Sequence, residues 1–156
     1  MEIVKLTDKN SAVFARVCRW SYDWWGRDTG LSMEEVAYIL EHSIHEDRLP
    51  QTFVALLGGE PAGMYQLSMS DDLRSRPDIY PWLANVYVDE KFRGKQVCRA
   101  MMNTVCENAA KVGLKEVYLY THHVGLYEKF GWKFVEKVPT FKKDSPWEGL
   151  YRMEIR

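Results

Sequence analysis

The segment between residues 86 and 99 carries the clearest chemical pattern in the sequence. An apolar run ends at Val88, a short loop with a glycine follows, and a helical pattern begins at about Lys95. The first turn of a helix presents unpaired backbone N–H groups and the positive end of the helix dipole. Arg93, Lys95 and Arg99 add positive charge there. The segment therefore predicts an anion site that favours phosphate over a carboxylate, the alternative being a basic loop that only caps the helix.

The cysteines and histidines do not form a metal-binding pattern. Cys18, Cys98 and Cys106 are an odd number without a Cys-x-x-Cys pair, which predicts neither a disulfide framework nor a zinc site. His42 and His45 are three residues apart on an expected helix, where a solvent-facing position is the simpler interpretation. We expect no metal and reduced thiols, as in a cytoplasmic protein.

Composition narrows the class of protein further. The 156 residues carry 21 basic and 22 acidic side chains, and 46% are hydrophobic. A net charge of −1 argues against a nucleic-acid partner, because phosphate neutralisation needs a basic face. No apolar run is long enough to span a membrane, and the amino-terminal residues lack the apolar core of a signal peptide. We expect one globular domain over residues 1–156 and a cytoplasmic location.

Apolar periodicity and turn signals predict the elements that hold these residues. Ser32 followed by Glu35 is a capping-box pattern, and Gly58-Gly59 is a hairpin signal. The expected order is strand 2–6, helix 10–25, helix 32–47, strands 52–57, 62–69 and 82–88, helix 95–112, strand 116–121, short helix 124–130, and strands 132–138 and 150–155. This order predicts an α/β fold with a mixed sheet.

Three parts of the sequence resemble one known family. Segment 85–99, the run Leu119-Tyr120-Thr121 and the run 126–132 resemble the GNAT superfamily of acyl-CoA-dependent N-acetyltransferases, and the expected element order is similar over nearly the whole chain. In the family motif (Gln/Arg)-x-x-Gly-x-(Gly/Ala), Arg93 takes the first place. The two small positions fall on Gln96 and Cys98, so the chain departs from the motif at Gln96.

The resemblance implies a fold and a co-substrate. The fold is a mixed, mainly antiparallel central sheet flanked by helices, with splayed fourth and fifth strands. The co-substrate is acetyl-CoA, whose pantetheine arm would pair with the backbone of 86–88 and whose pyrophosphate would lie on the loop that follows. The residues implied to bind it are Val86, Tyr87, Val88, Arg93, Gly94, Lys95, Gln96, Val97, Cys98 and Arg99.

The resemblance also implies direct attack of a free amine on the thioester. A backbone N–H near Val86 or Tyr87 would donate to the oxygen on which negative charge develops. Tyr127 is the expected acid that protonates the departing thiolate, since a phenol of pKa ~10 is only slightly weaker as an acid than a thiol of pKa ~8.5. A purely structural ring in the core is the alternative for Tyr127.

The general base is less clearly marked. Asp72, or its neighbour Asp71, follows the third expected strand and is the candidate carboxylate. Asn85 is an amide and cannot serve as a base, but it or a backbone carbonyl could relay a proton through water. His122 and His123 follow the fifth expected strand, and one of them could accept a proton near neutral pH.

Aromatic residues are candidates for the wall of an acceptor pocket. The residues expected to line it are Trp25, Trp82, Trp147 and Asn85. Trp20 and Trp24 are four apart, so we expect both to face the core and Trp25 to be the exposed one. Aromatic rings beside carboxylates suit a cationic amine.

The leading hypothesis is an N-acetyltransferase that moves an acetyl group from acetyl-CoA to a primary amine of a small molecule or peptide. One alternative is a non-catalytic or impaired acyl-CoA sensor, motivated by Gln96. Another is an aminoglycoside-modifying acetyltransferase, which shares the fold. A homodimer is possible, because dimers are common in the family.

Overall fold

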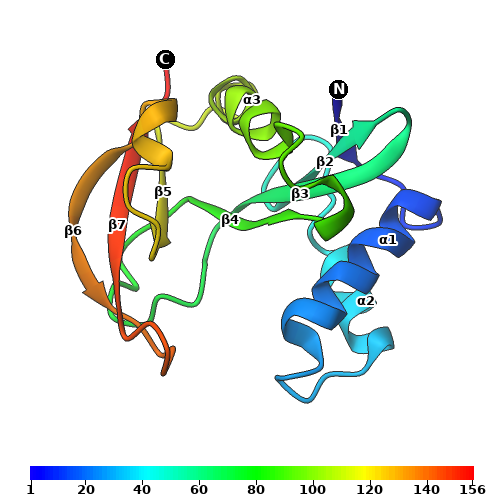
Figure 1. Ribbon diagram of the computed structural model, residues 1–156, viewed down its shortest axis with the longest axis horizontal. Coiled ribbons are helices and arrows are strands. Elements are labelled where there is room, and N and C mark those ends of the chain that lie inside the picture. Colours follow the sequence, from blue (N-terminus) through cyan, green and yellow to red (C-terminus); the bar gives the residue numbers. More distant parts are fainter. The chain divides into compact units, whose positions relative to one another are not determined.

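The computed structural model describes all of residues 1–156 and contains both strands and helices (Figure 1). The strands are β1 Glu2–Leu6, β2 Gln51–Leu57, β3 Glu60–Ser68, β4 Trp82–Val88, β5 Glu116–Thr121, β6 Lys133–Pro139 and β7 Trp147–Glu154. The helices are α1 Ala12–Ser21, α2 Met33–Glu41 and α3 Val97–Lys111, with a π-helical turn at Tyr22–Gly26 and 3-10 turns at Glu90–Phe92 and Tyr127–Phe130.

The strands are hydrogen-bonded in the order β1-β2-β3-β4-β5-β7-β6. The pairs β1–β2, β5–β7 and β6–β7 are antiparallel, whereas β4 and β5 are parallel with Trp82 opposite Tyr118. This arrangement confirms the expected mixed, mainly antiparallel sheet. None of the helices is both long and apolar enough to cross a membrane.

The predicted strands agree with the structure to within a few residues, and the differences concern the helices. The helix expected over 32–47 ends at Glu41, because the following backbone bonds to β2 instead. The Ser43 carbonyl accepts from Thr52 Oγ1 at 2.7 Å, and the Glu46 carbonyl accepts from Gln51 Nε2 at 2.9 Å. The segment expected as a helix from residue 124 is only the 3-10 turn at Tyr127–Phe130.

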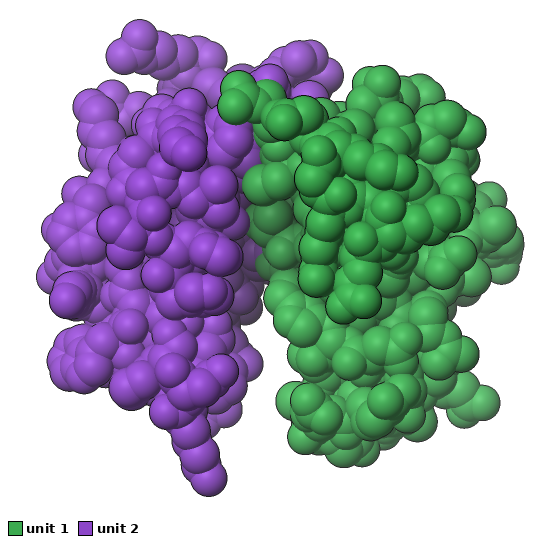
Figure 2. All heavy atoms as spheres, viewed as in Figure 1, with its two compact units in different colours: residues 1–66, 85–101 green, residues 67–84, 102–156 purple.

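The chain divides into two compact units (Figure 2). Unit 1 comprises residues 1–66 and 85–101, and unit 2 comprises residues 67–84 and 102–156. Strand β4 and helix α3 each contribute residues to both units. The prediction of a single domain over 1–156 stays a prediction.

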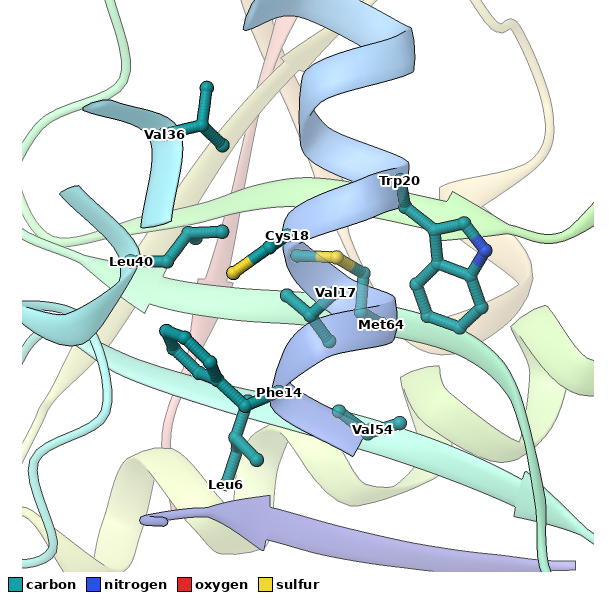
Figure 3. Packing of buried hydrophobic residues seen from close by; sticks show 9 residues of the cluster. All are labelled: Leu6, Phe14, Val17, Cys18, Trp20, Val36, Leu40, Val54 and Met64. Atoms are coloured by element: carbon teal, nitrogen blue, oxygen red, sulfur yellow. The ribbon is translucent and has the colours of Figure 1, made fainter. Parts of the chain in front are cut away.

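The core of unit 1 lies where α1 and α2 pack on β1–β3 (Figure 3). Its buried residues are Leu6, Phe14, Val17, Cys18, Trp20, Val36, Leu40, Val54 and Met64. The α1 members recur every three or four residues, which places them on one face of the helix. Full burial of each large apolar side chain contributes about 1.5–3 kcal/mol. Gly26 permits the close approach of the two helices, since a Cβ there would lie 2.6 Å from Val36 Cγ2.

The core of unit 2 is smaller. It joins Leu73, Ile79, Trp82, Val138 and Leu150, with the rings of Tyr118 and Tyr120 packed against it. The indole Nε1 of Trp82 donates to the carbonyl of Ile79 at 2.9 Å, so its one polar group is satisfied inside the core. This cluster fixes β5 and β7, the strands that carry the titratable residues described below.

The capping box predicted for α2 is present and makes a testable contribution to stability. Ser32 Oγ accepts from the Glu35 backbone N–H at 3.1 Å, and Glu35 Oε2 accepts from the Ser32 backbone N–H at 2.7 Å. We expect Ser32→Ala to lower the free energy of unfolding by about 1 kcal/mol in urea denaturation. Ser70→Ala, at an exposed loop position, is the control and should change it little; equal effects would contradict a role for the cap.

Candidate active site

In unit 1, Asp89 fixes the start of the basic loop that follows β4. Asp89 Oδ2 accepts from the indole N–H of Trp20 on α1 at 2.8 Å, and Oδ1 accepts from the Lys91 backbone N–H at 3.0 Å. Burial acts to raise the pKa of Asp89, but these hydrogen bonds outweigh it and hold the pKa below its ordinary value. An ionised Asp89 therefore ties the loop to the first helix.

The loop backbone adopts left-handed conformations at two nearby positions. Gly94 has φ +77° and Gln96 has φ +64°. The Gln96 side chain does not extend freely, because its Oε1 accepts from Arg99 Nε at 2.9 Å. Val97 is buried and begins α3, so the loop and the unpaired N–H groups of the first turn are held in place. Burial raises the pKa of the Cys98 thiol, which therefore acts as a small neutral side chain.

Arg93 lies on the exposed side of the loop and folds back on it. Its Nε donates to the Val88 carbonyl at 3.3 Å, and its Nη1 lies 3.6 Å from Glu90 Oε1. The pair is exposed, so it contributes little to stability and can exchange for a stronger anionic partner. The ammonium groups of Lys91 and Lys95 lie over the buried ring of Phe92 at 5.2 and 5.4 Å. The loop thus concentrates positive charge as the sequence predicts.

Gly63 on β3 lets two expected cofactor-binding segments approach closely. A Cβ at this position would lie 2.7 Å from the Tyr87 carbonyl oxygen and 3.0 Å from Val97 Cγ1. Any larger residue would push the β4 backbone or the first turn of α3 outward. Within unit 1 the structure therefore brings together the 86–88 backbone and the loop over 93–99.

Asn85 is held by a chain of buried hydrogen bonds in unit 1. Its Nδ2 donates to Gln66 Oε1 at 2.5 Å, Gln66 Nε2 donates to Thr52 Oγ1 at 2.9 Å, and Thr52 Oγ1 donates to the Ser43 carbonyl. Asn85 also has φ +51°, a left-handed conformation that Asn tolerates better than most residues. The network fixes its amide orientation on β4, and its role in acceptor binding stays a prediction.

The expected exposure of two tryptophans is wrong. Trp24 is 45% exposed and packs on the ring of Tyr87 at 5.4 Å, whereas Trp25 is half-buried against the unit 1 core. Both residues lie in the π-helical turn at Tyr22–Gly26, which follows α1. Trp20 and Trp24 both pack on the ring of Tyr87, at centroid distances of 5.4 Å, so they share one face, but Trp24 lies beyond the end of α1 and stays exposed.

In unit 2 the other aromatic candidates differ in how far their side chains are exposed. Trp82 is only 2% exposed and is a core residue, so it does not line an open pocket. Trp147 is 62% exposed at the start of β7. Tyr127 is buried, with its ring edge against Trp132 at a centroid distance of 6.3 Å. It lies in the 3-10 turn that Gly131 ends with φ +89°.

Asp71 rather than Asp72 has the environment of a base. Asp71 is partly buried, and burial raises the pKa of its carboxyl to about 7, against an opposing effect of Lys142 and with support from the negative charges of Asp72 and Glu148. Asp72 is exposed with φ +47°. A carboxyl that titrates near neutral pH can both accept and release a proton under ordinary conditions.

The group around Asp71 includes residues that the sequence analysis does not single out. Lys142 Nζ contacts Glu148 Oε1 at 3.0 Å and lies 5.1 Å from the centroid of the Tyr120 ring. Burial, followed by the charges of Asp71, Glu148 and Asp72, raises the pKa of the Tyr120 phenol above its ordinary range. We call Asp71, Tyr120, Lys142 and Glu148 the carboxylate cluster. Its sequence signal is weak: Glu148 occupies an inward position of a strand, where a charged residue is unusual.

The rings of His122 and His123 lie in contact, with centroids 4.1 Å apart and planes tilted by 36°. Burial, followed by repulsion from His122, lowers the pKa of His123, so its ring is neutral at physiological pH. No three His, Cys, Asp or Glu side chains are placed to hold a metal ion.

Comparison with known families identifies the family of the chain. The model of the acetyltransferase (GNAT) family matches residues 14–132, which is more than half of the chain. The chain belongs to the GNAT acetyltransferase family. A search of the curated proteins finds no match.

Solved structures of GNAT acetyltransferases share the fold at low identity. An aminoglycoside 6'-acetyltransferase type Ii is 18% identical with a TM-score of 0.74, covering 100% of this chain and 98% of that one. A GNAT acetyltransferase from Elizabethkingia anophelis with acetyl-CoA bound is 19% identical with a TM-score of 0.65, covering 98% and 97%. The ribosomal-protein-S18-alanine N-acetyltransferase from Escherichia coli is 15% identical with a TM-score of 0.65, covering 99% and 93%.

The raised pKa of Asp71 predicts how the stability of this GNAT protein depends on pH. The folded carboxyl keeps its proton up to about pH 7, whereas the unfolded one releases it near 3.8, so the folded state binds more protons in between. Stability is therefore lost as pH rises through this window, by at most about 1.4 kcal/mol per pH unit. We expect Asp71→Asn to remove this loss in urea denaturation series.

The matched control is Asp72→Asn, which changes the neighbouring exposed carboxyl. It should leave the pH dependence of unfolding in that window as in the unmodified protein. If the free energy of unfolding of the Asp71→Asn protein depends on pH as that of the unmodified protein does, Asp71 has an ordinary pKa.

Proposed function

We propose that this protein transfers an acetyl group from acetyl-CoA to a primary amine, with Asp71 as the base. The observation that carries the proposal is the match to the GNAT family over residues 14–132 together with the rigid basic loop of unit 1. Acetyl-CoA supplies the activated acetyl group as a thioester. The residues of the chain must bind it, free the amine of its proton and protonate the departing thiolate.

The loop after β4 has the properties that a pyrophosphate requires. Gly94 and Gln96 take left-handed conformations, of the kind from which backbone N–H groups can form an anion-binding nest. The first turn of α3 adds further unpaired N–H groups and the helix dipole. Arg93, Lys95 and Arg99 provide charge, and the Arg93 contact to Glu90 is weak enough to exchange.

Asp71 would take the proton from the amine. An alkylammonium of pKa about 10.4 gives its proton to a carboxylate of pKa about 7 at a cost of about 5 kcal/mol. An ordinary aspartate, with a pKa near 3.8, would be a much weaker base. The freed lone pair attacks the thioester carbon, and the carbon–sulfur bond breaks. The products are the acetamide and CoA thiol: the first amine proton is on Asp71, and the second, lost from the nitrogen as the carbon–sulfur bond breaks, is released to solvent, while Tyr127 protonates the thiolate.

Tyr127 is our candidate for the acid that protonates the thiolate. Its ring is buried against Trp132 in unit 2, so its orientation is fixed, and the phenol would recover its proton from solvent after the products leave. On the oxygen that gains negative charge, the backbone N–H near Val86 or Tyr87 would act as donor. The low dielectric of a buried site strengthens such contacts.

The direct test of the proposal is release of CoA thiol from acetyl-CoA in the presence of a panel of primary amines. We expect Asp71→Asn to lower kcat by about 10²–10⁴-fold, as removal of a general base does, with little change in the Kd for acetyl-CoA. Asp72→Asn is the control and should keep most of the activity. If both variants work as well as the unmodified enzyme, another group or a water chain removes the proton.

A substitution at Gln96 distinguishes this proposal from the alternative of a non-catalytic sensor that binds acetyl-CoA weakly. The left-handed backbone of Gln96 is already the conformation a glycine would take, and Arg99 holds its side chain. We infer from this that the motif departure leaves the anion site open. We expect Gln96→Gly to change the Kd for acetyl-CoA by less than about threefold, or ~0.7 kcal/mol, in calorimetric titration. A gain above about tenfold, or ~1.4 kcal/mol, would instead support an impaired sensor.

A further inference from the structure

In unit 2 the primary ammonium group of Lys142 lies against a buried carboxylate. Lys142 lies in the short connection between β6 and β7, which Thr140 closes through hydrogen bonds to the carbonyls of Ser145 and Pro146. From there its Nζ reaches Glu148 Oε1 at 3.0 Å and the face of the Tyr120 ring at 5.1 Å. A carboxylate on one side and an aromatic face on another are the usual elements of a binding site for an ammonium ion.

The carboxyl groups of this site outnumber the single ammonium group of Lys142. The Glu148 side chain is 0% exposed, and its second oxygen, Oε2, is buried without a hydrogen-bond partner. Asp71 lies close enough to both groups for electrostatic interaction: its charge raises the pKa of Tyr120, and the charge of Lys142 lowers the pKa of Asp71. A buried carboxylate oxygen without a donor is costly, so the cluster retains the capacity to bind a cationic donor.

Lys142 differs from its partners in being able to leave. Its side chain is 37% exposed, whereas that of Glu148 is fully buried. A flexible four-carbon side chain on a hairpin connection can swing into solvent, where its ammonium is well hydrated. Glu148 and Tyr120 would stay in place, since both belong to strands of the sheet.

We propose that Glu148, Asp71 and the face of Tyr120 form a binding site for a primary alkylammonium ion, and that Lys142 occupies this site until the ligand displaces it. The proposal rests on the proposed function in one respect: the ligand would be the acceptor amine, held beside the base. The substrate class would then be a primary amine on an unbranched alkyl chain. Lys142 then acts as an internal competitor that raises the amine concentration needed for binding.

The test uses Lys142→Ala, which removes three carbons and the ammonium, and n-propylammonium, which replaces them. We expect n-propylammonium to bind Lys142→Ala at least tenfold more tightly than it binds the unmodified protein, in NMR titration without acetyl-CoA. It should also raise the melting temperature of that variant. The isosteric neutral alcohol n-propanol should do neither. Lys143→Ala, at the exposed neighbouring position, is the matched control and should behave as the unmodified protein.

Adding Glu148→Gln to Lys142→Ala should abolish the binding, because the charge that selects an ammonium is gone. If n-propylammonium binds Lys142→Ala no better than n-propanol does, Lys142 is only a structural ion pair and the proposal is wrong. If Lys142→Ala does not fold, Lys142→Ser carries the same test. Binding without thiol release from acetyl-CoA would contradict the proposed function and leave this site standing.

Discussion

The burial of Glu148 and Asp71 beside a single lysine is the constraint on which the chemistry of unit 2 depends. Two carboxyl groups withdrawn from water cannot both be ionised cheaply near one ammonium group. Glu148 is the one that contacts Lys142, and Asp71 is the one whose pKa rises to about 7. Burial is the main cause of that rise, with added repulsion from Asp72 and Glu148, and it leaves Asp71 able to exchange a proton near neutral pH.

In unit 1 the proposed binding of a phosphate group depends on backbone geometry. Its basic loop is fixed by an ionised Asp89 at one end and by buried Val97 at the other. Gly63 allows β4 and the first turn of α3 to lie close to β3. Binding of a phosphate group therefore needs little rearrangement of the backbone, and the conformational cost of ordering a loop is already met by folding.

The sequence predicts much of this architecture because its signals are local. Strand periodicity and the Ser32 capping box depend on residues within one turn or one strand, and the structure confirms them; the basic loop is equally local, and its role as an anion site stays a prediction. The failures depend on distant contacts. Trp24 lies beyond the end of α1 and stays exposed, and helix α2 ends early because its following carbonyls bond to β2. Lys142 has no local signal, since its partners come from two other strands.

The proposed base depends on a neutral-range pKa for the Asp71 carboxyl, which carboxyl-carbon NMR measures directly. A protein labelled with ¹³C at aspartate carboxyl groups would be titrated with pH, with Asp71→Asn used to assign the resonance. We predict a midpoint of about 7 for Asp71. A midpoint near the ordinary aspartate value of 3.8 would contradict the account.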